Sequence, residues 1–217
     1  MNLTGKPEDQ ITYQGHQYRL NLAYPIVLTV CDTLADERLA PEERVTLCLR
    51  LLLTGNQSAE VGPADEVPLL DLIYHEKIEL AENVLAAKLF KARKPVFDFE
   101  LDAGRIAASF RQQYQIDLTN AQERNHISWA FFNALLNGLD DDTPFRKATA
   151  FRTMEIPKDA TADQRKYISQ MKQLYALDQP KKGRKSTLQQ QMAGMDRVQR
   201  VKFLAAQMKK EGGDDNG

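Results

Sequence analysis

The stretch FDFELDAGRIAASFRQQYQIDL, residues 97–118, is the most informative part of the 217-residue chain, because it opens with three alternating carboxylates: Asp98, Glu100 and Asp102. Alternating acids are typical of a calcium-binding EF-hand loop, which also has Gly at its sixth position and Glu at its twelfth. Counted from Asp98, those two positions hold Ala103 and Ser109. The spacing does not fit an EF-hand, and we expect no metal site in this stretch.

A helix accounts for the same residues. If Asp98 caps the helix, Glu100 and Asp102 fall in its first turns, where negative charge meets the positive end of the helix dipole. The apolar residues then recur at helical spacing and form one stripe, which consists of Phe99, Ala103, Ile106, Ala107, Phe110 and Tyr114. The three acids are therefore predicted to have a structural role at the start of a packed helix.

Helical patterns dominate the rest of the chain. The exception is ITYQGHQYRL, residues 11–20, whose alternation around Gly15 predicts a small N-terminal β-hairpin. A loop is expected at residues 56–66. Helices are predicted from Pro25 to about Leu34, from Pro41 to about Gly55, from about Pro68 to Arg93, over 121–139, between Pro144 and Pro157, and from the capping box at 161–164 onward. The predicted fold class is mainly α, with a compact helical domain over residues 1–177.

Two of these helices have informative apolar faces. The segment AQERNHISWAFFNALLNGL, residues 121–139, is apolar on nearly all sides and reaches a stop at Gly138. A helix of this kind is usually central, so we expect Trp129 to be buried. The helix after the capping box carries its apolar residues on one face: Tyr167, Ile168, Met171, Leu174 and Tyr175.

Charge is distributed unevenly, although the formal net charge is only −1. Residues 181–210 contain nine Lys and Arg and one acid, whereas residues 1–180 contain 20 basic and 26 acidic residues. An acidic body and a basic extension indicate separate roles. We expect residues 178–217 to be a basic linker followed by an amphipathic helix, whose apolar face contains Leu188, Met192, Met195, Val198, Val201, Leu204 and Met208.

The sequence gives no support for a membrane protein or an enzyme. No basic start leads into an apolar run, and the longest apolar stretches fall far short of the ~20 residues of a membrane span, so we expect a soluble, cytosolic protein. Cys31 and Cys48 lie in apolar helical patterns away from the histidines, which favours core packing over zinc binding. Nucleotide-binding, nucleophile-elbow and metalloprotease motifs are absent, and the acids at 140–142 are expected in a solvated loop. We predict no catalytic residue, metal or cofactor.

Three stretches in this order, 97–118, WAFFNALLNGL at 129–139 and FRTMEIPK at 151–158, resemble a family of tail morphogenesis proteins from long-tailed phages and prophages of Gram-positive bacteria. Members of that family resemble or function as tail assembly chaperones and are encoded beside the tape-measure protein. The resemblance covers about residues 10–177, with Ser128 and Gln115 as small departures. The principal residues of its packing motif are Asp98, Phe99, Asp102, Phe110, Tyr114, Trp129, Leu135, Arg152 and Pro157.

The resemblance implies a non-enzymatic chaperone of the host bacterial cytoplasm. Such a protein would bind the tape-measure protein, keep it soluble, and be displaced by tail tube protein; self-association is a further expectation. Methionine side chains repack readily against varied partners, so the candidate partner-binding residues are Met192, Met195, Val198, Leu204 and Met208. Two alternatives are a nucleic-acid-binding module that uses the basic extension, which the acidic body disfavours, and a structural tail component.

Overall fold

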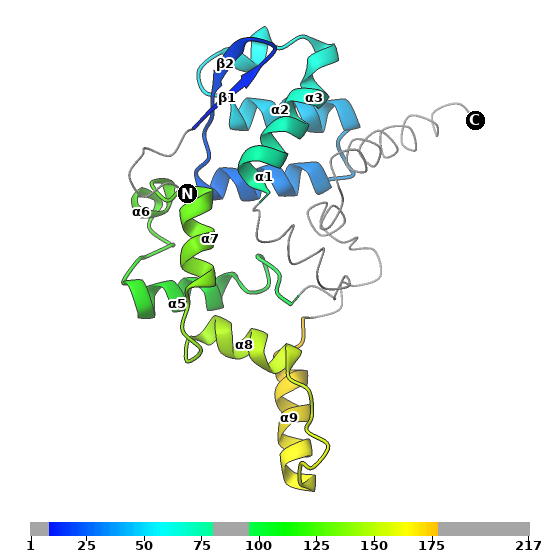
Figure 1. The fold of residues 1–217 in the computed structure, drawn as a ribbon, viewed down its shortest axis with the longest axis vertical. Helices are drawn as coiled ribbons and strands as arrows, with labels where there is room; N and C mark the ends of the chain where they lie inside the picture. Colours follow the sequence, from blue (N-terminus) through cyan, green and yellow to red (C-terminus); the bar gives the residue numbers. More distant parts are fainter. Residues whose placement is uncertain (1–8, 80–95, 178–217) are drawn as a thin grey trace, which may run out of the picture. The chain divides into compact units, whose positions relative to one another are not determined.

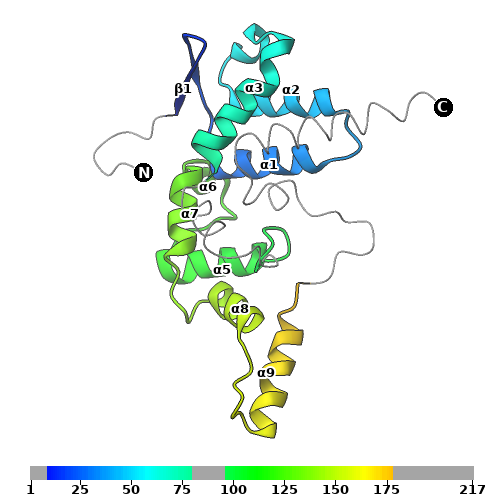
Figure 2. The ribbon, with the colours of Figure 1, turned by 45° about the vertical axis from the view of Figure 1, so that its right-hand side comes forward.

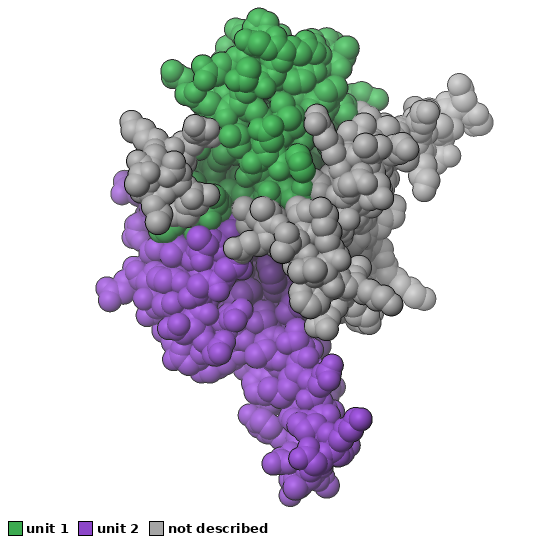
Figure 3. Space-filling model, viewed as in Figure 1, with its two compact units in different colours: residues 1–92, 125–131, 186–217 green, residues 93–124, 132–185 purple. Residues whose placement is uncertain are grey.

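A computed structural model describes residues 9–79 and 96–177, which are mainly helical with one two-stranded antiparallel hairpin (Figure 1). The predicted fold class is therefore confirmed. The chain divides into two compact units (Figure 3). Of the described residues, unit 1 contains 9–79 and 125–131, and unit 2 contains 96–124 and 132–177.

Unit 1 begins with the predicted hairpin. Strand β1 (Gln10–Tyr13) pairs with β2 (His16–Arg19), so that Ile11 lies opposite Tyr18. The two turn residues, Gln14 and Gly15, have φ values of 49° and 83°. Two consecutive left-handed residues are the signature of the tight turn whose twist matches that of paired strands. The hairpin therefore follows directly from the Gln-Gly dipeptide between two alternating segments.

Three helices form most of unit 1: α1 (Tyr24–Ala35), α2 (Pro41–Leu52) and α3 (Pro63–Ile73). Each has proline in its first turn, where the missing N–H costs no hydrogen bond. Their buried faces meet in a core that contains Val27, Val30, Cys48, Leu49, Leu52, Leu69 and Ile73. The short 3₁₀ turn η1 (Gln57–Glu60) and the early start of α3 replace the loop expected at residues 56–66.

The long helix predicted from Pro68 to Arg93 is wrong in the described part of the chain. Helix α3 starts earlier and passes into a π-helical turn, η2 (Tyr74–Ile78), and Glu79 then adopts an extended conformation. In this turn the N–H of Glu79 donates to the carbonyl of Tyr74 at 2.7 Å, five residues back. Residues 80–93 of the predicted helix lie outside the described residues.

The indole of Trp129 binds the last residue of this turn. Its Nε1 donates to the carbonyl oxygen of Ile78 at 2.7 Å, and the side chain is 2% exposed. The predicted burial of Trp129 is therefore confirmed. The backbone of the same segment pairs with residues 22–24, since Trp129 N donates to Leu22 O at 2.7 Å and Tyr24 N to Ile127 O at 3.0 Å.

This pairing also breaks the single helix predicted over residues 121–139. Backbone groups at residues 127 and 129 bond to a distant strand-like segment, so they cannot continue a helical ladder. The segment consequently forms two helices, α6 (Ala121–Asn125) and α7 (Trp129–Asn137). The chain passes from unit 1 to unit 2 within α7.

Unit 2 contains α5 (Ala103–Tyr114), α8 (Pro144–Thr153) and α9 (Ala162–Leu174). Helix α5 packs on α8, and Phe110 of α5 stacks on Phe132 with ring centroids 5.3 Å apart. The capping box predicted at Thr161 and Gln164 is present at the start of α9. Both ribbon views show one end of α9 near the end of α8 and the other end extending away from α5 and α8 (Figures 1 and 2).

Candidate functional site

The first acid of the 97–118 stretch, Asp98, is a capping residue, as predicted. The carboxylate of Asp98 accepts hydrogen bonds from the backbone N–H groups of Glu100 and Leu101, each at 2.9 Å. It therefore caps a turn that precedes α5, and the helix itself begins at Ala103. The predicted capping role of Asp98 is confirmed, because an N-cap side chain accepts from the amides two and three residues later. The regular helix nevertheless starts later than predicted, at Ala103.

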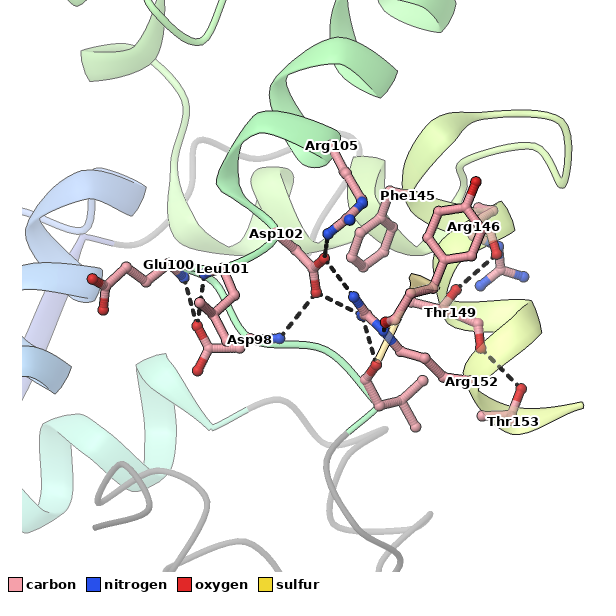
Figure 4. Close-up of polar contacts among 12 residues, drawn as sticks. Asp98, Glu100, Leu101, Asp102, Arg105, Phe145, Arg146, Thr149, Arg152 and Thr153 are labelled. Atoms are coloured by element: carbon pink, nitrogen blue, oxygen red, sulfur yellow. Dashed lines mark hydrogen bonds and ion pairs between the residues drawn. The ribbon is translucent and has the colours of Figure 1, made fainter. Parts of the chain in front are cut away.

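Asp102 is the N-cap residue of α5, close to the predicted position, and it is buried, with 0% of its surface exposed. Two guanidinium nitrogens of Arg152 donate to its two carboxylate oxygens at 2.7 and 2.8 Å, in a bidentate ion pair (Figure 4). Arg105 donates to the same carboxylate at 2.8 Å, and the backbone N–H of Asp98 donates at 3.2 Å. We call Asp102, Arg105 and Arg152 the carboxylate cluster.

Arg152 extends the carboxylate cluster to two further segments. Its guanidinium also donates to the carbonyl of Val96 at 3.0 Å and to the carbonyl of Tyr175. The guanidinium of Arg105 lies over the Tyr175 ring, 5.6 Å from its centroid. One arginine on α8 therefore fixes the entry to α5, residue 96 and the residue that follows α9.

The electrostatics of the cluster favour an ionised Asp102. Burial by itself raises the pKa of this carboxyl, but hydrogen bonds from Arg152, from the Asp98 backbone and from Arg105 outweigh it and place the pKa below the ordinary value of 3.8. Every oxygen of the carboxylate is occupied by donors from within the protein. The arrangement suits a structural tie, since no surface of Asp102 is open to a ligand or metal ion.

Ser109 joins α5 to α8 beside this cluster. Its hydroxyl donates to the carbonyl of Arg105 at 2.7 Å and accepts from the backbone N–H of Phe145 at 2.9 Å. The second bond satisfies an amide at the start of α8 that has no partner within that helix. Sequence reasoning missed Ser109 because a serine inside a helical pattern gives no local sign of a distant partner. The spacing of Asp102 and Arg105, three residues apart on one helix face, is the signal that could have identified Arg105.

The remaining aromatic residues of the family motif hold the same unit together. Phe99 lies against Phe97 and Phe132, and Phe110 is fully buried. The hydroxyl of Tyr114 donates to the carbonyl of Leu135 at 2.9 Å, which joins α5 to α7. Pro157 differs from the others because it is exposed in the turn before α9. Trp129 belongs to unit 1, so the motif residues do not form one site.

Other residues considered from the sequence form no metal or membrane site in the described ranges 9–79 and 96–177. No group of three His, Cys, Asp or Glu side chains there could hold a metal ion, and no helix there is long and apolar enough to cross a membrane. Cys31 and Cys48 are buried free thiols, as predicted, and burial raises the pKa of each to about 12. Met192, Met195, Val198, Leu204 and Met208 lie outside the described residues.

A comparison with protein-family models identifies a bacteriophage protein. The model described as "Bacteriophage Gp15 protein" matches residues 7–177, which is most of the chain, so the chain belongs to that family. The matched range ends at the residue where the sequence predicts the compact domain to end. No curated protein and no solved structure matches the chain. The resemblance to a phage family is confirmed at this level.

Proposed function

We propose that the protein is a non-enzymatic tail assembly chaperone that binds the tape-measure protein in the host bacterial cytoplasm and keeps it soluble until tail tube protein displaces it. Membership of a bacteriophage family supports a role in phage morphogenesis. The mainly helical body supports a partner interface made by helices, which suits a long helical partner such as a tape-measure protein.

The observation that carries the proposal is the position of the motif residues. Asp102 and Phe110 are fully buried, and Arg152 is engaged with backbone and carboxylate groups inside unit 2. Internal contacts occupy the polar groups of these residues, which supports a role in maintaining the fold. We therefore place the function on the surface of the protein, where a chaperone would bind its partner.

The C-terminal extension supplies the second part of the proposal. Its apolar residues include Met192, Met195 and Met208, whose flexible side chains suit contacts that must form and then be replaced. The extension also contains Lys181, Lys182, Arg184 and Lys185, which are the residues that a nucleic-acid-binding protein would use. The two sets of residues can be exchanged separately, so the partner class can be tested directly.

Co-purification with the tape-measure protein encoded by the same phage or prophage tests the proposal. We expect replacement of Met192, Met195 and Met208 by Ser to reduce capture more than replacement of the four basic residues by Gln. A matched control is Leu47→Ser, which changes an exposed apolar residue of unit 1. The proposal fails if the ranking is reversed, or if the protein binds DNA or RNA with an affinity that falls steeply as salt rises and captures no tape-measure protein.

A further inference from the structure

We draw no further inference here: the strongest candidate, the outer edge of strand β1, where the backbone groups of Gln10 and Thr12 point away from β2, carries no proposal because nothing in residues 9–79 and 96–177, which the structure describes, shows what covers it.

Discussion

Asp102 and Arg152 are fifty residues apart in the sequence and form a bidentate ion pair with N–O distances of 2.7 and 2.8 Å. Asp102 is completely buried, and the side chain of Arg152 is 8% exposed. The pair joins the first residues of α5 to the end of α8, and through the carbonyl of Tyr175 it also holds the end of α9. The stability of unit 2 therefore depends on a contact between two of the stretches on which the family resemblance rests.

Removing the arginine tests this dependence. Arg152→Met leaves the buried carboxylate without its bidentate partner, so we expect a loss of about 3–5 kcal/mol in the free energy of unfolding measured in urea. Arg146→Met is the control, because Arg146 forms a 3.5 Å ion pair with an almost fully exposed Asp141 and its removal should cost less than about 1 kcal/mol. Equal losses for the two variants would show that the carboxylate cluster is not a structural tie.

The pKa of Asp102 predicts an acid-sensitive contribution to stability. Because the pKa is lowered in the folded protein, the contribution is fully present above the unfolded value of about 3.8 and is lost as pH falls through the folded value. We expect Asp102→Asn to destabilise the protein strongly at about pH 6, and the cost to decrease progressively as pH falls below about 3.8. Asp141→Asn is the control, because it changes an almost fully exposed carboxylate. A pH-independent cost of Asp102→Asn would contradict the assignment.

Trp129 is expected to be essential to unit 1. Trp129→Ala should cost about 3–5 kcal/mol, because it removes a large buried aromatic side chain. Trp129→Phe retains part of the packing but leaves the Ile78 carbonyl without the indole donor, which should cost about 1–3 kcal/mol. Urea unfolding followed by circular dichroism measures both. A loss below about 1 kcal/mol for Trp129→Ala would show that this side chain is not central.

The acids at 98–102 are expected to respond to mutation and not to metal ions. Asp98→Ala removes the cap of the turn before α5 and should lower stability by about 1 kcal/mol. Neither calcium nor magnesium should change the melting temperature of the wild-type protein, because the carboxylate of Asp102 is fully occupied by internal donors. A clear metal-dependent rise in the melting temperature would refute the structural role of these acids.

Local patterns predicted the elements whose cause is local. The Gln14-Gly15 turn, the prolines that open α1 and α2, and the Thr161–Gln164 capping box each depend on neighbouring residues, and each is present. The burial of Trp129 was also predicted from a local pattern, because a helix that is apolar on all sides is usually buried.

Long-range contacts account for the predictions that failed. The helix expected over 121–139 breaks because backbone groups at Ile127 and Trp129 pair with residues 22–24, about one hundred residues earlier. Asp102 was predicted to interact with the positive end of the helix dipole. Its partner Arg152 lies fifty residues away, so the local sequence pattern does not indicate the ion pair. The π-helical turn at Tyr74–Ile78 similarly ends where the distant indole of Trp129 binds.

The most direct test of the proposed function is the solubility of the tape-measure protein. In the absence of tail tube protein, we expect the soluble fraction of the tape-measure protein from the same phage or prophage to rise when it is co-expressed with the full-length chain. We expect it to rise less with the chain truncated after Leu177. The truncated body should remain folded by circular dichroism, because the family match ends at residue 177. A soluble fraction that is the same with the full-length chain, with the truncated chain and with neither would contradict the account.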